Sequence, residues 1–388
     1  MFDVGARIIK KLLIQNLFWS FLVSVIAVAY PIRTFSEPNN PIVGHDPVRP
    51  FPYQEEEISF VNPQAGVTLA GTLTLPSGQG PFPAVLIIAG AGPHKRDGYN
   101  GYPAHKLLIL ADFLTRQGIA TLRYDKRGIG ASSGDYQTAT SQDFADDASF
   151  GVEYLKDRKG IDPKKIGLVG HSEGGLIAPM VAAHSKYVSF VVLMAGLGVN
   201  GEKIILRQRE LNDQARGLGE RPVSIWQKMI LLGLEEIKKE KDQAVVMEKI
   251  SEIDRTEMIP LIKDDPQAIQ EAQAYWKDLG DRYPLFGPWG RFLLACDPKI
   301  TLKKVTCPVL AIGGGKDVMV PPGDNLPAME NALKEGKNPD FLIKLFPNMG
   351  HGFQTCKPGP SLDTADPLQG LALEVLAFIG DWIGKHTK

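Results

Sequence analysis

Short apolar runs alternate along most of the chain with segments of helical periodicity. The runs are rich in Val, Ile, Leu and Phe and cover residues 67–75, 84–89, 119–122, 165–169, 189–195, 309–313 and 341–346. Between several of them, apolar residues recur at helical spacing, in segments 102–117, 142–158 and 176–185. Strands that alternate with helices predict an α/β fold, with a mostly parallel sheet and helices on both faces. The runs AVLIIA and FVVLMA are continuously apolar, as strands buried on both faces are.

Two segments depart from this rhythm. No helix separates residues 55–61 from 67–75, so these runs predict an antiparallel hairpin at the edge of the sheet. Residues 201–298 contain no convincing strand, and 33 of these 98 residues are charged. Runs at 226–241 and 267–277 have helical spacing with one polar face. We expect a helical insertion between two core strands, placed as a lid over an active site would be. The alternative is a domain that only packs against the core and interacts with solvent.

The N-terminus has the pattern of an export signal. Arg7, Lys10 and Lys11 precede an apolar segment, 17–29, that ends in Ala-Val-Ala. This segment is shorter than the roughly 20 apolar residues that span a bilayer. Extended back to residue 12 it becomes a marginal span, so a membrane tether through residues 12–29 is one alternative, and a buried helix is another.

These patterns together predict the organisation of the chain. Residues 1–29 are expected to be the signal, and residues 30–54, with six prolines, an extended linker. A core of residues 55–200 and 299–388 surrounds the insertion at 201–298. The protein is therefore predicted to be exported, to the periplasm or beyond the cell, with an uncleaved membrane anchor as the alternative.

The composition of the chain excludes several classes of protein. The 388 residues carry 43 Lys plus Arg against 44 Asp plus Glu, a net charge of −1, which excludes binding of nucleic acid by bulk charge. A hydrophobic fraction of 44% excludes disorder along the whole chain. Three cysteines are too few for a four-cysteine zinc site. Outside the cytoplasm they allow one disulfide and one thiol, or three free thiols. None lies beside a His and acid pattern that would make it a nucleophile.

The segment Gly170-His171-Ser172-Glu173-Gly174 follows a strand run and precedes a helical run. It matches G-x-S-x-G, a sharp turn that exposes a serine nucleophile at the top of a sheet. Such a turn strains the backbone at the serine and leaves no room for bulky neighbours, so Gly170 and Gly174 fit it. The alternative is a glycine-rich turn with an incidental serine.

Two further loops follow strand runs. Asp317, in Gly-Gly-Gly-Lys-Asp, follows the run at 309–313, where α/β sheets place functional groups. This acid would accept a hydrogen bond from a histidine Nδ1–H. Asp324 is a competitor, but it lies at an expected helix start, where capping explains it.

His351, between two glycines, follows the run at 341–346 and completes the order serine, acid, histidine. The other six histidines lie in the linker, in loops or at helix ends, beside Ser172 and in the tail: His45, His94, His105, His171, His184 and His386.

An oxyanion hole is expected from backbone N–H groups. One is that of Glu173, directly after the serine, and the other, from the loop Gly90-Ala91-Gly92-Pro93, is that of Ala91. The chain has no phosphate-binding G-x-x-x-x-G-K-[ST], no dinucleotide fingerprint after the first parallel strand and no H-E-x-x-H. We therefore expect neither a nucleotide cofactor nor a metal.

The motifs GHSEGG, GGGKDVMVPP, NMGHGF and RYDKRGIGASSG together resemble the α/β-hydrolase superfamily, over roughly residues 55–385. Its bacterial esterases and serine-aminopeptidase-like hydrolases are the most similar branch. The resemblance implies a Ser172 nucleophile, a His351 base and an Asp317 acid. It also implies an architectural role for the RYDKRG loop, with Asp125 and Arg127 in buried ion pairing. One departure is Ala89-Gly90, where many members carry His-Gly.

The sequence thus predicts a serine hydrolase acting on small carboxylic esters through an acyl-enzyme. A serine aminopeptidase is the first alternative, with Glu235, Glu236 or Asp281 as candidates to bind a substrate α-amine. A non-catalytic binding protein on the same fold is the second.

Overall fold

The computed structural model describes residues 46–98, 105–215, 217, 220–266, 268–271, 274–276, 284–357 and 369–388. The predicted signal, and the linker up to residue 45, lie outside these residues. No helix of the described part is long and apolar enough to cross a membrane.

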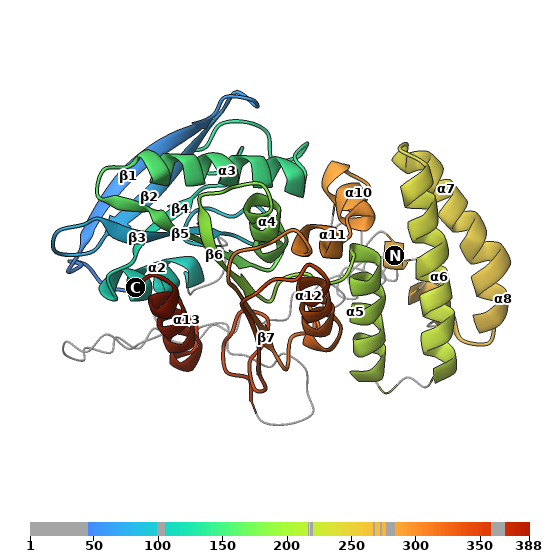
Figure 1. Cartoon of the computed structure of the whole chain (residues 1–388). Coiled ribbons are helices and arrows are strands. Elements are labelled where there is room, and N and C mark those ends of the chain that lie inside the picture. The colour runs from blue at the N-terminus through green and yellow to red at the C-terminus, as the bar shows by residue number, and fades with distance from the viewer. Residues whose placement is uncertain are drawn as a thin grey trace, which may run out of the picture. The chain divides into compact units, whose positions relative to one another are not determined.

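The core of the protein is an eight-stranded sheet with the order β1-β2-β4-β3-β5-β6-β7-β8 (Figure 1). The strands from β4 across to β8 are parallel, while β2 is antiparallel to both β1 and β4. Their bounds are β1 Gln54–Asn62, β2 Val67–Leu75, β3 Phe82–Ile88, β4 Ala120–Tyr124, β5 Ile161–His171, β6 Val188–Met194, β7 Val309–Gly314 and β8 Phe341–Phe346. The predicted parallel sheet and the antiparallel edge hairpin are confirmed.

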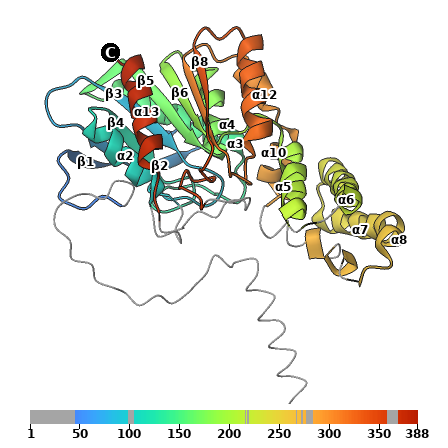
Figure 2. The ribbon, with the colours of Figure 1, turned by 90° about the horizontal axis from the view of Figure 1, so that it is seen from below.

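Helices cover both faces of the sheet, as predicted. Alternate strand residues face opposite sides, so the central strands β3, β5, β6 and β7 contribute to two apolar cores. One core joins the sheet to α3 (Ser141–Asp157), α4 (Glu173–Ala182) and α12 (Pro322–Glu335). The other joins it to α2 (Lys106–Arg116) and α13 (Leu373–His386), which lie in front of the sheet in Figure 2.

Residues 201–298 leave the sheet after β6 and return before β7, although these two strands are paired neighbours. The described residues of this insertion contain no strand, and α11 (Pro298–Leu302) begins at its last residue. Its helices include α5 Gly201–Ala215, α6 Glu220–Lys239, α7 Gln243–Ile253, the π-helix η1 Asp254–Met258, α8 Ile259–Ile262 and α10 Pro288–Ala295. Most of them share a separate apolar cluster that includes Trp226, Ile230 and Trp276.

Two element boundaries differ from the sequence prediction, and both lie next to Ser172. Strand β5 continues to His171, and α4 begins at Glu173, three residues before the predicted helix. The segment from Gly170 to Gly175 has no apolar periodicity, so its pattern could not reveal a strand and a helix separated by one residue. Ser172 is that residue.

Candidate active site

Ser172 occupies a strained turn between β5 and α4. Its φ of 57° and ψ of −116° lie outside the regions that L residues favour. The Ser172 N–H donates to Met194 O at 2.8 Å, which anchors the turn to β6. A Cβ at Gly170 would collide with the Gly174 carbonyl, and one at Gly174 with the Ile88 carbonyl. The sharp turn predicted by G-x-S-x-G is present, and it closes because these two positions lack side chains.

Asp317 lies on the loop after β7, and its side chain is fully buried. Oδ1 accepts from the N–H groups of Met319 and Val320, both at 2.8 Å, so the carboxylate has one fixed orientation. The competitor Asp324 lies in the first turn of α12, is half exposed and pairs with Arg207 at 3.2 Å. The geometry therefore favours Asp317 over Asp324 as the acid.

His351 lies on the loop after β8 and meets Asp317 there. Its Nδ1 donates to Asp317 Oδ2 at 2.8 Å, which leaves Nε2 as the basic nitrogen. The two loops are joined by main-chain bonds, Gly315 N to Phe346 O at 2.8 Å and Lys316 N to Met349 O at 2.9 Å. Because β7 and β8 are parallel neighbours, the loops that follow them emerge at the same edge of the sheet.

His171 also takes part in this site, which sequence reasoning did not foresee. Its Nε2 donates to the His351 carbonyl at 2.9 Å, and the two rings lie 4.9 Å apart. Burial and the neighbouring His351 hold the pKa of His171 well below its ordinary value, so the ring is neutral. A carbonyl only accepts, so the single ring proton is on Nε2. The sequence placed His171 beside Ser172 but carried no signal of a bond to a loop 180 residues away.

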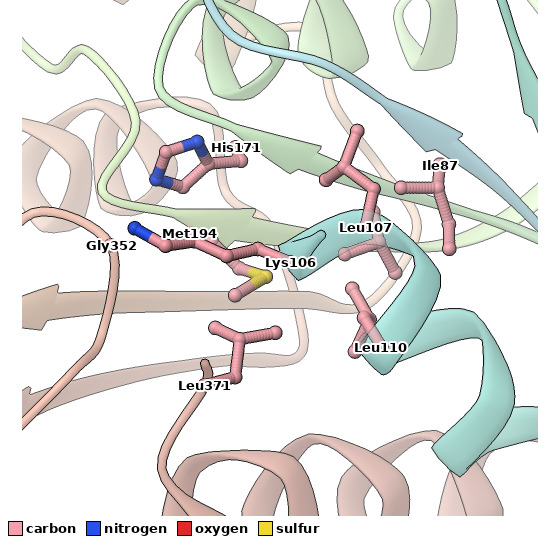
Figure 3. A pocket seen from close by; sticks show the side chains of 9 residues that line it. Ile87, Lys106, Leu107, Leu110, His171, Met194, Gly352 and Leu371 are labelled. Atoms are coloured by element: carbon pink, nitrogen blue, oxygen red, sulfur yellow. The ribbon is translucent and has the colours of Figure 1, made fainter. Parts of the chain in front are cut away.

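A small cavity lies beneath the His351 loop (Figure 3). It measures about 20 Å³, and apolar side chains of β3, β5, β6 and α2 line it together with Lys106, His171 and Gly352. Figure 3 shows the Lys106 amine and the His171 ring reaching into the same space. This volume holds one water molecule, so the cavity is no substrate pocket.

The predicted oxyanion loop lies against the serine turn. A Cβ built on Gly90 would lie 3.1 Å from Ser172 Cβ, so the backbone here passes close to the nucleophile position. The Ala91 carbonyl accepts from His94 Nε2 at 2.8 Å. Burial, and to a lesser extent the positive charge of Lys126, lowers the pKa of His94 to about 4. His94 is thus neutral near pH 7 and donates to the loop, a contact that the sequence did not predict.

The Glu173 side chain points into the core rather than toward solvent, and Glu173 is 3% exposed. Its carboxylate accepts from Lys126 Nζ at 2.7 Å and from Ser141 Oγ and Trp289 Nε1, each at 2.6 Å. Burial alone would raise the pKa of this carboxyl, but the Lys126 charge and the three hydrogen bonds outweigh burial and lower it. Sequence reasoning used only the Glu173 N–H. The one available signal was Lys126, a lysine two residues after the buried strand β4.

The RYDKRG loop is built from ion pairs, as its resemblance implied. Asp125 binds Arg96 at 2.9 Å, and Arg127 binds Asp147 at 2.7 Å. Asp125 and Arg127 are therefore both buried and paired, each with a partner from another segment rather than with one another.

Glu235 and Glu236, candidates from the sequence to bind an α-amine, form ion pairs with lysines of the insertion. The third candidate, Asp281, lies outside the described residues. Cys296 and Cys307 are free thiols, and burial raises the pKa of each, to about 11 for Cys307. Within the described ranges, no three His, Cys, Asp or Glu side chains are grouped to hold a metal ion.

The sheet topology, the serine turn and the paired loops define a class. The sequence profile of the alpha/beta hydrolase family matches residues 85–357, and the chain belongs to that family. It has the α/β-hydrolase fold.

Relatives of known name include esterase EstD of Thermotoga maritima, 29% identical over 79% of this chain and 61% of EstD. Thiohydrolase aneE of Aspergillus aculeatus is 30% identical over 37% of this chain and 42% of that protein. The chain thus spans less than two thirds of the length of these relatives. Among solved structures, the alpha/beta hydrolase GrgF from Penicillium superimposes with a TM-score of 0.51 over 87% of this chain and 99% of GrgF, at 19% identity.

Proposed function

We propose that this protein hydrolyses carboxylic esters of small molecules through an acyl-enzyme on Ser172. The observation that carries the proposal is the Nδ1 to Oδ2 hydrogen bond between His351 and Asp317, beside the strained turn of Ser172. The similarity to an esterase over 79% of the chain supports the same substrate class.

In the first half of the reaction, Ser172 Oγ attacks the ester carbonyl while His351 Nε2 accepts its proton. Asp317 fixes the tautomer of His351 and stabilises the imidazolium, and its own orientation is held by Met319 N and Val320 N. The N–H groups of Ala91 and Glu173 stabilise the tetrahedral oxyanion. His351 then protonates the leaving alcohol.

In the second half, water attacks the acyl-enzyme. His351 takes a proton from this water and returns it to Ser172 Oγ as the carboxylic acid leaves. His171 Nε2 cannot act as the base here, because it carries the proton donated to the His351 carbonyl. The remaining lone pair, on Nδ1, is weakly basic because burial lowers the pKa of His171.

Replacement of Ser172 by Ala is the direct test. We expect kcat for p-nitrophenyl esters to fall by about 10³ to 10⁶, since triad members act as a unit. A fluorophosphonate should label the wild type but not Ser172→Ala. Ester turnover within tenfold of wild type would contradict the assignment, and an unlabelled wild type would favour a non-catalytic binding protein.

The substrate class is tested by parallel assays of p-nitrophenyl esters graded by acyl length and of aminoacyl-p-nitroanilides. We expect turnover of the esters. Turnover of the anilides alone would identify an aminopeptidase instead.

Two further parts of the proposal concern the flanking segments. The insertion would act as a lid, since α5 and α10 contact the loops around Ser172 and Asp317.

The N-terminal pattern would direct export, as a cleaved signal or as a tether. Cell fractionation with N-terminal sequencing of the mature protein tests this point, and full-length protein in the cytoplasm would contradict it.

A further inference from the structure

Glu173 follows Ser172, so its N–H lies at the predicted oxyanion position while its side chain points the opposite way. An acid in the first turn of a helix usually caps that helix or favours its dipole. Here all three donors come from other segments: the loop after β4, the start of α3 and the start of α10. The carboxylate therefore fixes the turn to its surroundings.

The loop after β4 also binds the residues that follow the Gly90–Pro93 loop, which carries the other predicted oxyanion donor, Ala91 N–H. The Lys126 N–H donates to His94 O at 3.2 Å, and Asp125 Oδ1 accepts from Arg96 N at 2.8 Å. Both contacts lie directly after the Gly90–Pro93 loop. Asp125 and Lys126 thus anchor the loop that carries Ala91. Lys126 also binds the side chain of Glu173, the residue that supplies the second oxyanion N–H.

The third partner belongs to the helical insertion. Trp289, the second residue of α10, is 9% exposed and packs into the core cluster shared by the sheet, α3 and α4. Figure 1 shows α10 beside α3. The indole N–H reaches Glu173 Oε1, which also accepts from Ser141. The position of α10 is therefore coupled to the turn after the nucleophile through one buried carboxylate.

We propose that Lys126, Glu173 and Trp289 form a positioning unit that sets the oxyanion N–H groups and links them to the insertion. None of the three touches the reacting atoms through its side chain. The inference rests on the proposed function, because an oxyanion hole is required only if Ser172 forms a tetrahedral intermediate.

Trp289→Phe tests the link to the insertion, because it removes the N–H and keeps an aromatic ring. We expect kcat for a short p-nitrophenyl ester to fall about tenfold, with KM changed less than twofold, since oxyanion contacts form mainly in the transition state. Trp276→Phe is the matched control. Trp276 is a buried tryptophan of the insertion whose N–H has no partner in the described part of the chain. We expect this control to keep wild-type kcat, and equal kcat in all three proteins would overturn the inference.

Lys126→Met tests the charge. It leaves a buried carboxylate with two neutral donors, so the carboxyl should take up a proton nearer neutral pH and the pH profile of kcat should gain an ionisation. The titratable groups that face Glu173 are Lys126, His94 and Tyr124. Burial raises the pKa of Tyr124 far above this range, but loss of Lys126 would also raise the pKa of His94.

The double variant Lys126→Met/Glu173→Gln separates these two sources. It has no carboxyl at position 173 and no unpaired buried charge, so the added ionisation should disappear and kcat should recover relative to Lys126→Met. A profile unchanged in the double variant would assign the ionisation to His94 and contradict the inference. Should Lys126→Met fail to fold, the comparison of Trp289→Phe with Trp276→Phe decides.

Fluorophosphonate labelling of the wild type distinguishes the two failures. If the wild type is labelled and Trp289→Phe matches it in kcat, only the positioning unit is wrong. If the wild type is neither labelled nor active, the proposed function fails and the inference fails with it.

Discussion

Single residues in this site hold energetically unfavourable states because their neighbours leave no alternative. Ser172 keeps backbone angles that cost on the order of 1–3 kcal/mol. Its N–H is bound to Met194 O, and the glycines on either side close the turn. Asp317 is a fully buried carboxylate, yet two backbone N–H groups and His351 satisfy it. Such constraints fix the orientation of the groups that the proposed reaction uses.

Asp317→Asn changes little in volume but replaces an acceptor by an amide that can donate. We expect kcat to fall by about 10⁴, because His351 loses the partner that fixes its tautomer. Asp324→Asn is the matched control, since Asp324 lies in the first turn of α12, soon after the Asp317 loop, and pairs with Arg207 instead. Steady-state kinetics on a p-nitrophenyl ester measures both variants. The assignment of the acid is wrong if Asp324→Asn loses the activity and Asp317→Asn keeps it.

His171→Phe removes the donor to the His351 carbonyl while retaining a planar ring. A hydrogen bond of this kind contributes about 1 kcal/mol, so we expect kcat to decrease about fivefold to tenfold. His386→Phe is the control, because His386 Nδ1 also donates to a main-chain carbonyl, that of Trp382 at 2.8 Å, in the C-terminal helix. Equal kcat values in the two variants would show that the bond from His171 does not position the His351 loop.

At the scale of elements, two polar side chains of the insertion contact the segments next to Ser172 and Asp317. Gln208 of α5 donates to Met319 O at 2.6 Å, two residues after Asp317, and Trp289 of α10 donates to Glu173. Most helices of the insertion pack on one another in their own apolar cluster. The insertion is not separate throughout, because Trp289 of α10 packs into the main core cluster and Ile204 of α5 packs against Leu176 and Val320. A partly separate cluster that is joined to the core through α5 and α10 is compatible with the proposed lid.

The π-helix η1 contains Asp254, whose Oδ1 is buried and has no partner among the described residues. Burial raises the pKa of this carboxyl from 3.8 to about 6. Above pH 6 the folded protein must therefore hold an unpaired buried charge, whereas the unfolded chain ionises freely near pH 4. The folded state loses stability as pH rises from about 4 to 6, and the loss remains at higher pH.

Asp254→Asn should remove this loss. We expect a higher Tm than wild type at pH 7.5 and a difference that shrinks as pH falls through 6 and approaches zero only below pH 4. Differential scanning calorimetry at several pH values measures it, with the exposed Asp264→Asn as control. A Tm difference independent of pH would show that ionisation of Asp254 is not the cause.

At the scale of the whole molecule, the cysteines left two possibilities open in the sequence. Cys296 and Cys307 carry free thiols, and burial raises the pKa of both. We expect the same Tm with and without a reducing agent, and slow alkylation by iodoacetamide at pH 7.5. A Tm that falls on reduction would reveal a disulfide.

The strands and the chain order of the proposed triad residues followed from the sequence because they depend on local patterns. Continuous apolar runs identify strands buried on both faces, and Ser172 and Asp317 each follow such a run. His351 follows β8, an edge strand that is only partly buried but is still recognisable from its apolar and aromatic residues. Parallel topology then places all three loops at one edge of the sheet. The predicted element bounds were less accurate at the serine turn, because its glycines leave no pattern of apolar and polar residues.

The contacts between distant segments could be decided only by the tertiary structure. His171 to His351, Lys126 to Glu173 and Trp289 to Glu173 are separated by 180, 47 and 116 residues. Their hydrogen bonds depend on side-chain direction and burial, which no local pattern encodes. The sequence alone thus determined a parallel α/β sheet with a serine, an acid and a histidine at its edge. The tertiary structure decided which buried charges and neutral histidines position the loops at that edge. The hydrogen bonds and ion pairs between them become strong only when water has been excluded from donor and acceptor.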